Sequence, residues 1–400
     1  MNMQARIKRE IEDVDLLVTQ QANELSAMLH EHRMEMFPPD ARKTLRSFSL
    51  AEVANYLGVT PGYLKNLSLE GKGPQPAVTP SGRRSYTAEQ MLEMRHYLDK
   101  NARTAKYVPH RREGEHLQII SVVNFKGGSA KTTTAAHLAQ HLSLEGYRVL
   151  VIDLDPQASL SALHGFQPEI DRNESLYEAL RYDDQRKSLR ELVRPTNFPG
   201  LHIVPANLEL QEYEYDTPLA LSRDDGSMGR IFFGRLDDAL ADVADDYDVV
   251  IIDCPPQLGY LTLTALSSST GVLITVHPQM LDVMSMCQFL MMMGEVMGTL
   301  KRAGANMQLD WLRYLVTRYE PTDGPQSQMV AFMRAIFKKH VLVNEMLKST
   351  AISDAGITKQ TLYEIDRSQF TRSTYDRAME SLHLVNREIV ELIQKAWGRR

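Results

Sequence analysis

Six short runs rich in β-branched residues, separated by stretches of helical character, constrain the fold of this chain more than any other feature. They fall at 117–125, 148–155, 201–206, 248–256, 271–278 and 312–319. Each run is almost continuously apolar, whereas a strand with one face in solvent alternates apolar and polar residues. Apolar strands that alternate with helices predict an α/β fold, with a mostly parallel sheet covered by helices on both faces.

Length, cysteine content and the absence of targeting segments indicate the kind of protein. The chain has 400 residues, of which 43% are apolar, so it can form two or three domains with sizeable cores. Cys254 and Cys287 are too few for a disulfide framework and are typical of a reducing compartment. Residues 1–14 lack the apolar core of a signal peptide, and no run approaches the roughly 20 apolar residues of a membrane span. We therefore expect a cytoplasmic protein.

Positive charge is concentrated in one segment of an otherwise acidic chain. The formal net charge is −6, but residues 42–112 hold 13 Lys and Arg against 5 Asp and Glu. Residues 113–400 hold 28 basic residues against 38 acidic ones. A compact basic segment in an acidic protein indicates that this segment alone contacts DNA sequence-specifically.

A loop of small residues follows the first apolar run and leads into an apolar helix. Its sequence is Asn-Phe-Lys-Gly-Gly-Ser-Ala-Lys-Thr-Thr-Thr, residues 124–134. Glycines let backbone N–H groups turn inward around phosphates, and the helix N-terminus adds its positive dipole end. The pattern predicts a phosphate-binding loop in which Lys131 bridges the β- and γ-phosphates of ATP and the Thr132 hydroxyl holds Mg²⁺. The residues expected to contact the nucleotide here are Lys126, Gly127, Gly128, Ser129, Ala130, Lys131, Thr132 and Thr133.

The loop departs from the usual phosphate-loop pattern at two positions. Lys126 stands directly before the glycine pair, and Ala130 stands where a glycine normally precedes the loop lysine. The extra lysine resembles the deviant Walker family, which includes partition ATPases, septum-site ATPases and the nitrogenase iron protein. That resemblance implies a homodimer in which Lys126 reaches the phosphates bound by the partner. Because alanine adopts positive φ less readily than glycine, Ala130 bears on the hydrolysis rate more than on nucleotide binding.

Acidic residues end two of the apolar runs. Asp153 and Asp155, followed by Pro-Gln, resemble the Asp-x-Asp-Pro-Gln switch of the family. The resemblance implies that Asp155 positions or activates the attacking water and that Asp153 lies nearer the Mg²⁺ shell. Four apolar residues precede Asp253, which is the Walker B arrangement for holding Mg²⁺. After later strands, where relatives contact adenine and ribose, this chain has Pro278, Thr317 and Arg318.

Residues 48–86 predict two short helices followed by a hairpin. The first helix spans 50–57 and ends at Gly58, and Thr60 caps the second helix with Pro61 at its first position. The segment resembles the winged helix-turn-helix of the mercury-resistance-regulator type, whose second helix enters the major groove. A helical adaptor with merely solvated basic residues is the alternative. The resemblance assigns DNA contacts to Tyr63, Lys65, Asn66, Arg83 and Arg84.

The first residues predict one long helix. Apolar positions from Ile7 to Leu29 recur at spacings of three and four, and the pattern runs over 4–36 without glycine or proline. Such a helix packs its apolar stripe on the body or pairs with a partner helix, and we favour pairing. The predicted domains are a dimerisation helix at 1–40, a winged helix-turn-helix domain at 41–110 and an ATPase domain at 111–400.

The order of these parts resembles the large partition ATPases of low-copy plasmids, and most closely the RepA family of the repABC plasmids. The resemblance covers nearly the whole chain, including residues 124–169 and 246–269. It implies a weak ATPase that uses ATP, ADP and Mg²⁺ and is stimulated by a centromere-binding ParB/RepB-type protein. It also implies non-specific binding to nucleoid DNA and specific binding to an operator, through which the protein represses its own operon.

Three other functions compete with this interpretation. A septum-site ATPase needs a basic amphipathic C-terminal helix, but the polar face of the tail from Tyr375 is acidic as well as basic, so we expect no stable membrane association. An iron–sulfur reductase needs two cluster cysteines, and Cys254 lies inside a strand end. A nucleotide-gated transcriptional repressor with little or no ATP turnover is the strongest rival, because Ala130 is unusual.

Overall fold

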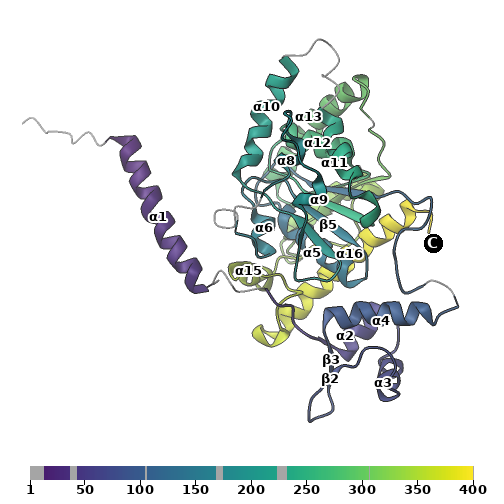
Figure 1. Cartoon of the computed structure of the whole chain (residues 1–400). Coiled ribbons are helices and arrows are strands. Elements are labelled where there is room, and N and C mark those ends of the chain that lie inside the picture. The colour runs from purple at the N-terminus through teal and green to yellow at the C-terminus, as the bar shows by residue number, and fades with distance from the viewer. Residues whose placement is uncertain are drawn as a thin grey trace, which may run out of the picture. The chain divides into compact units, whose positions relative to one another are not determined.

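The computed structural model describes residues 13–36, 43–103, 106–167, 174–222, 232–305 and 307–399. The chain divides into two units, Met1–Lys43 and Thr44–Arg400 (Figure 1). The described part of the first unit is the helix α1 (Val14–Met36), which ends where the sequence predicts. The start of that predicted helix, with Ile7 and Ile11, lies outside the described residues.

A seven-stranded sheet forms the centre of the second unit, in the order β10-β9-β4-β8-β5-β7-β6. All neighbouring strands are parallel except the antiparallel pair of β6 with β7. The six apolar runs become six strands, which confirms the predicted fold class, whereas the two-residue edge strand β6 has no apolar signal. The strands are β4 (Gln118–Val123), β5 (Val149–Asp153), β6 (Arg194–Pro195), β7 (Leu201–Val204), β8 (Val249–Asp253), β9 (Gly271–Val276) and β10 (Trp311–Val316).

Helices cover both faces of this sheet (Figure 1). Alternate residues of one strand enter two separate cores: Val249 and Ile251 of β8 enter the first, and Val250 and Ile252 enter the second. The first core contains α5 (Lys131–Leu144), α15 (Thr350–Ile357) and α16 (Arg372–Ala396). The second contains α11 (Arg235–Ala241), α12 (Tyr260–Ser268), α13 (Met280–Arg302) and α14 (Gly324–Phe337). Shorter elements at the edges are α6 (Ser159–Leu163), α8 (Tyr177–Leu180), α9 (Leu189–Leu192) and α10 (Glu212–Ser222).

Residues 48–100 fold as the local signals predict. α2 (Leu50–Leu57) ends at Gly58, whose φ is 63°, and α3 (Pro61–Leu69) is capped by the Thr60 side chain. Short strands β1 (Phe48–Ser49), β2 (Ala77–Val78) and β3 (Arg84–Tyr86) form a three-stranded sheet, and α4 (Ala88–Lys100) follows. Left-handed backbone at a C-cap favours glycine because a Cβ atom is strained there.

The side chain of Arg95 on α4 joins this segment to α5. It is only 5% exposed, and its Nη2 donates to the carbonyls of Tyr56 at 2.5 Å and Leu144 at 3.1 Å. Its Nη1 donates to the carbonyl of Tyr107 at 3.0 Å, in the segment that follows α4. One guanidinium therefore satisfies three carbonyls from α2, the end of α5 and the segment after α4.

Two long helices bear on the question of membrane association. α16 buries Leu382, Val385 and Ile389 completely in the first core, which is how a core helix packs. α13 is the one helix in the described part of the chain that is, by length and composition only, apolar enough to cross a membrane, and 28% of its most apolar window is buried. Its residues Met286 and Phe289 pack in the second core.

Three histidines lie where α5 packs against α16, of which His137 and His141 are buried and His383 is partly buried. The ring centroids of His141 and His383 are 5.5 Å apart, and those of Tyr56 and His383 are 5.8 Å apart. Burial lowers the pKa of His137 and of His383 to about 4, and lowers the pKa of His141 well below its ordinary value. These imidazoles are therefore neutral in the folded protein at neutral pH.

We expect the free energy of unfolding to fall as the pH falls from about 6.5 towards 4. The reason is that these histidines bind protons in the unfolded chain but stay neutral in the folded protein. His383→Phe should remove up to about 3 kcal/mol of this loss at pH 4, since one such proton is then absent. The measurement is chemical unfolding of wild type and variant from pH 8 to pH 4, with the exposed His340→Phe as the control. Parallel stability curves for wild type and His383→Phe would contradict the assignment.

Candidate functional site: a phosphate-binding crevice

The phosphate loop joins β4 to α5 through residues 124–130. Asn124 shapes the turn, because its Nδ2 donates to the Thr275 carbonyl and its Oδ1 accepts from the Lys126 amide at 3.0 Å. Gly128 and Ala130 have φ values of 77° and 65°, in the left-handed region. An alanine there carries strain of roughly 1 kcal/mol, which glycine would not.

Neighbouring strand ends hold the loop from two sides. The Thr275 hydroxyl, near the end of β9, donates to the Ser129 hydroxyl at 3.1 Å, and the Thr317 hydroxyl donates to the Ser129 carbonyl at 3.0 Å. Arg318, itself at φ 53°, donates from Nη1 to the Gly128 carbonyl at 3.2 Å. Thr317 and Arg318 therefore reach the loop as backbone supports, and Thr317 is completely buried.

A cavity of about 590 Å³ opens in front of the loop, which is within the range of small-molecule sites. The predicted residues Lys131, Thr132 and Asp155 line it, and Pro278 instead lines an apolar groove between α13 and α14. The residues that line the phosphate-loop cavity are Gly127, Gly128, Ala130, Lys131, Thr132, Thr133, Asp155, Gln157, Ser159, Ala162, Leu163, Pro256, Gly356 and Lys359.

The two loop lysines have different surroundings. Lys131 is 7% exposed, its Nζ donates to the Lys126 carbonyl at 3.4 Å, and burial lowers its pKa while Asp253 and Asp155 oppose that change. Lys126 is far more exposed, and its Nζ lies 3.0 Å from Oδ2 of Asp282 at the start of α13. Lys131 is thus fixed beside the cavity, whereas Lys126 is paired with its own chain.

Two carboxylates lie beneath the loop at adjacent positions of β5 and β8. Asp153 pairs in register with Asp253, and both are almost completely buried. Asp153 accepts hydrogen bonds from the Ser161 amide at 2.8 Å and the Ser161 hydroxyl at 2.7 Å, and burial raises its pKa to about 7. Burial, followed by the charge of Asp153, raises the pKa of Asp253 well above its ordinary value, and Thr132 and Lys131 oppose the rise.

The residues present fit a nucleotide with Mg²⁺. Neither carboxylate oxygen of Asp253 has a well-formed hydrogen bond, although the group is 1% exposed. A buried carboxylate without partners is costly unless a cation or donor completes it. Proteins usually bind Mg²⁺ through one or two carboxylates together with phosphates of the substrate, and Asp253 offers one such carboxylate beneath the phosphate loop.

The five predicted DNA-contact residues lie together on α3 and the hairpin. Tyr63 is 45% exposed, and Lys65 and Asn66 are also exposed on α3. Arg83 is exposed, and Arg84 is half-buried because its Nε donates to Ser68 at 3.4 Å. That contact places the hairpin against the end of α3.

Sequence reasoning missed the wall of the cavity that comes from the C-terminal part of the chain. Gly356 and Lys359 follow the last strand by about 40 residues and belong to no phosphate-loop pattern. It also missed the pairing of Lys126 with Asp282. Gln157 and Ser159 lie in the switch segment and could have been proposed from it.

We expect Ala130→Gly to stabilise the protein by about 0.5 kcal/mol, since relief of left-handed strain exceeds the entropy that glycine gains in the unfolded chain. Thermal unfolding of the nucleotide-free protein measures it. Ala139→Gly, inside α5, is the control and should lower the midpoint of thermal unfolding. A lower midpoint for Ala130→Gly would mean that the strain is absent.

Comparison with known proteins agrees with this geometry. A family model described as an AAA domain matches residues 117–306. The "Putative replication protein A" of Sinorhizobium fredii (strain NBRC 101917 / NGR234) is 65% identical over 386 residues, which cover 96% of this chain and 95% of that protein. The chromosome partitioning protein ParA of Myxococcus xanthus (strain DK1622) is 34% identical over 228 residues, which cover 56% of this chain and 73% of that protein.

A solved structure shows the same fold with ligands. The cobyrinic acid a,c-diamide synthase of Mycobacterium smegmatis, with a bound ATP analogue and magnesium, has a TM-score of 0.50 and 29% identity. The match covers 61% of this chain and 91% of that one. Identity along almost the whole length, a phosphate loop with a second lysine and a parallel sheet lead to one assignment. The chain belongs to the ParA-type family of deviant Walker plasmid partition ATPases, beside the RepA proteins of the repABC plasmids.

Proposed function

We propose that this protein segregates plasmid copies by slow ATP hydrolysis that a centromere-binding ParB/RepB-type protein stimulates. The observation that carries the proposal is the buried Asp253 carboxylate, which lacks hydrogen-bond partners beneath a cavity lined by the phosphate loop. A bound ATP–Mg²⁺ would supply the γ-phosphate for transfer to water, and the solved relative with an ATP analogue and magnesium supports this choice of ligand.

The residues of the crevice have separate roles in this proposal. Backbone amides of the phosphate loop and Lys131 bind the phosphates, and Thr132 and Asp253 hold Mg²⁺. Asp153 supports them from the adjacent strand, because it is engaged with Ser161 rather than lining the cavity. Asp155 lines the cavity and orients the attacking water.

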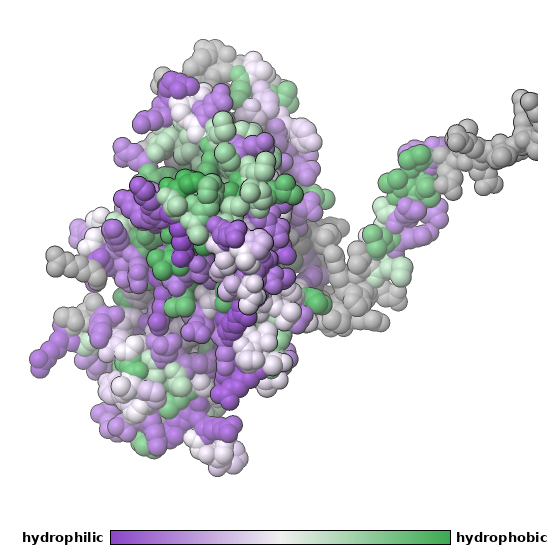
Figure 2. All heavy atoms as spheres, turned by 180° about the vertical axis from the view of Figure 1, so that it is seen from behind, coloured by the Kyte–Doolittle hydropathy of each residue, from purple (hydrophilic) through white to green (hydrophobic). Residues whose placement is uncertain are grey.

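The active form is a homodimer in which Lys126 leaves Asp282 and reaches the partner's phosphates. An unusually apolar surface supports a second copy here: α13 begins beside Lys126 and exposes Met280, Leu281 and Met284 by 58–71%. Apolar side chains gather in the upper half of the body in Figure 2. Burial of this surface would favour association, because exposed apolar patches of this kind mark interfaces. Pairing of α1 adds a second contact in the proposal.

DNA binding has two parts. Tyr63, Lys65 and Asn66 contact an operator and Arg83 and Arg84 its phosphates, which makes the protein an autorepressor. Non-specific binding to the nucleoid, and with it a cytoplasmic location, uses phosphate contacts elsewhere. A pocket of about 350 Å³ supports such contacts, and none of its lining residues is acidic. The residues that line this pocket are Leu347, Lys348, Ser349, Thr350, Ser373, Thr374, Arg377 and Ala378.

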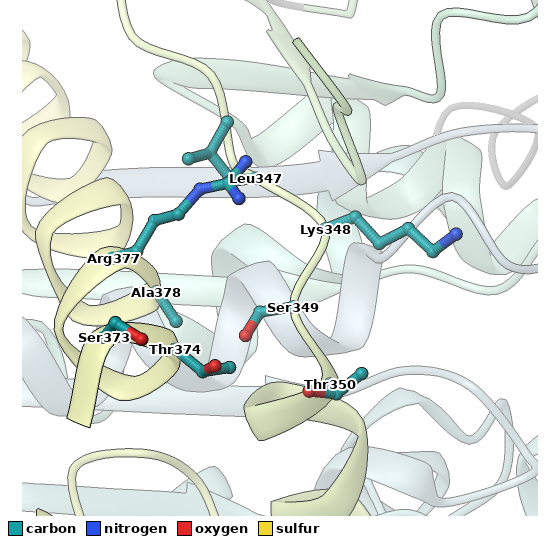
Figure 3. A pocket seen from close by; sticks show the side chains of 8 residues that line it. All are labelled: Leu347, Lys348, Ser349, Thr350, Ser373, Thr374, Arg377 and Ala378. Carbon is teal, nitrogen blue, oxygen red and sulfur yellow. The ribbon is translucent and has the colours of Figure 1, made fainter. Parts of the chain in front are cut away.

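The pocket joins the first turns of α15 and α16 (Figure 3). Arg377 extends towards Leu347 and Lys348 projects away from it, and the hydroxyl groups of Ser349, Thr350 and Thr374 lie below both cations in this view. Lys348 is paired with Glu320 at 2.7 Å, so it would exchange this partner for a phosphate.

A nucleotide-gated repressor with little turnover is the second candidate. Two observations favour it: Ala130 holds the loop in a strained conformation, and Arg95 links α4 to the end of the phosphate-loop helix. Such a protein would change its operator affinity with bound nucleotide but would not release phosphate.

We expect the two loop lysines to separate binding from assembly. Lys131→Ala should weaken ATP binding at least about 100-fold, since a charge-assisted contact to phosphate is lost from a buried position. Lys126→Ala should keep ATP affinity within about threefold but prevent ATP-dependent dimerisation, because its own-chain partner is Asp282. Fluorescent-nucleotide titration and light scattering measure the two properties. Normal dimerisation of Lys126→Ala, or normal ATP affinity of Lys131→Ala, would refute the corresponding role.

A further inference from the structure

The loop after the Walker B carboxylate is anchored at its far end by a residue from α10. Asp253 ends β8, residues 254–259 follow, and α12 begins at Tyr260. Glu214 accepts hydrogen bonds from the backbone amides of Tyr260 at 2.9 Å and Leu261 at 3.0 Å. The carboxylate thus caps α12, whose own N-cap residue, Gly259, has no side chain to do so.

This contact is close enough to fix the loop. A Cβ atom at Gly259 would lie 2.4 Å from Oε1 of Glu214, so a side chain at this position would displace the Glu214 carboxylate. Pro256, in the middle of the same loop, forms part of the cavity wall. Tyr213 adds a second link from α10 to α12, because its hydroxyl lies 3.2 Å from the hydroxyl of Thr264. A displacement of α10 would therefore move the cavity wall and the neighbourhood of Asp253.

Another side of α10 is open to solvent and carries a short apolar stripe made of Tyr215 and Leu219, which are 66% and 52% exposed. They lie on the same side of the helix, because residues four apart share a helix face. Leu208, which is 65% exposed, lies just before α10 in the short 3₁₀ helix Leu208–Gln211. α10 runs along the edge of the body in Figure 1, away from the HTH segment that contains α2 and α3.

The acidic residues around this stripe indicate what kind of partner it binds. Residues 207–222 contain Glu209, Glu212, Glu214 and Asp216, and no Lys or Arg. Glu209 and Glu212 are exposed beside the apolar side chains. An acidic, partly apolar surface repels DNA phosphates and anionic lipid, whereas it attracts a protein segment with Lys or Arg beside large apolar side chains.

We propose that the exposed face of α10 is the docking surface for a basic, apolar segment of the stimulating protein, and that Glu214 conveys this contact to the Asp253 loop. The proposal rests on the proposed function, since it needs a partner that stimulates turnover. Glu214 is a positioning residue: it touches α12, not the nucleotide, and acts through the loop that carries Pro256.

The docking test uses the full chain and the purified centromere-binding protein of the same plasmid, labelled for fluorescence anisotropy with ATP, Mg²⁺ and DNA present. The Tyr215→Ala/Leu219→Ala variant should bind at least about tenfold more weakly, as expected for exposed anchors of an interface. Its turnover without partner should stay within about twofold of wild type. Glu209→Lys/Glu212→Lys should also bind more weakly and lose most of the salt dependence. Leu384→Ala, an exposed apolar site on α16, is the control and should bind normally.

Each outcome has a separate meaning. Unchanged partner affinity in both α10 variants overturns the docking surface, even when stimulation of the wild type upholds the proposed function. Partner binding that depends on α10 without any stimulation of the wild type upholds the surface and overturns the proposed function. Loss of ATP-dependent dimerisation in the α10 variants would assign the surface to a second copy instead, and would also overturn the proposal.

The positioning role has its own readout. Glu214→Ala should lower kcat at least about tenfold while the KM for ATP stays within about threefold. The reason is that the variant loosens residues 254–259 after Asp253 and leaves the phosphate loop in place. Glu214→Gln, which keeps one acceptor oxygen, should recover part of the loss. A kcat for Glu214→Ala within twofold of wild type, or equal kcat and KM changes in both variants, would overturn the role.

Discussion

The burial of α5 sets the geometry of everything else in this molecule. All of its residues except Thr132 and Thr133, the two beside the cavity, are buried. Its N-terminus must lie at the phosphate loop, its middle must pack on β5 and β8, and its last carbonyl is held by Arg95. A helix held along its whole length cannot shift at one end alone, so the crevice and the segment of residues 48–100 share one rigid element.

Polar contacts along α5 strengthen this constraint. Asn386 of α16 donates to the carbonyl of His137 and to the hydroxyl of Tyr363, at 3.4 and 3.1 Å. The Tyr363 carbonyl accepts in turn from Arg46, which precedes α2. The segment around Tyr363 also follows Gly356 and Lys359 of the cavity wall. Two routes therefore connect the nucleotide cavity with the segment that contains α2, α3 and α4, one through α5 and one through residues 356–363.

The parts that sequence predicted are those whose cause is local. The phosphate loop needs only a buried strand, small residues and a helix start, and these are adjacent in the chain. The ends of α2 and α3 follow from Gly58, Thr60 and Pro61 for the same reason. The six strands follow from their apolar runs because both faces of the sheet are covered.

What could not be predicted comes from pairs distant in sequence. Lys359 reaches the cavity through the path of the chain after β10, and no motif or residue spacing in the sequence predicts this position. Asp282 pairs with Lys126 only because β9 lies next to β4 in the sheet. Glu214 looks like one acid among several in α10 until α12 is placed beside it. Residues 106–111, at the predicted boundary between two domains, are tied to the body by Arg95 and by the Asp248 contact of Arg111.

Phosphate release from ATP by the purified protein, alone and then with DNA and the centromere-binding protein together, tests the central claim most directly. We expect slow turnover alone and a clear rise, of about tenfold or more, when both are added, within the range that completing a preorganised phosphoryl-transfer site supplies. Tight ATP binding with no phosphate release under any of these conditions would contradict it, and would leave a nucleotide-gated repressor as the function of this chain.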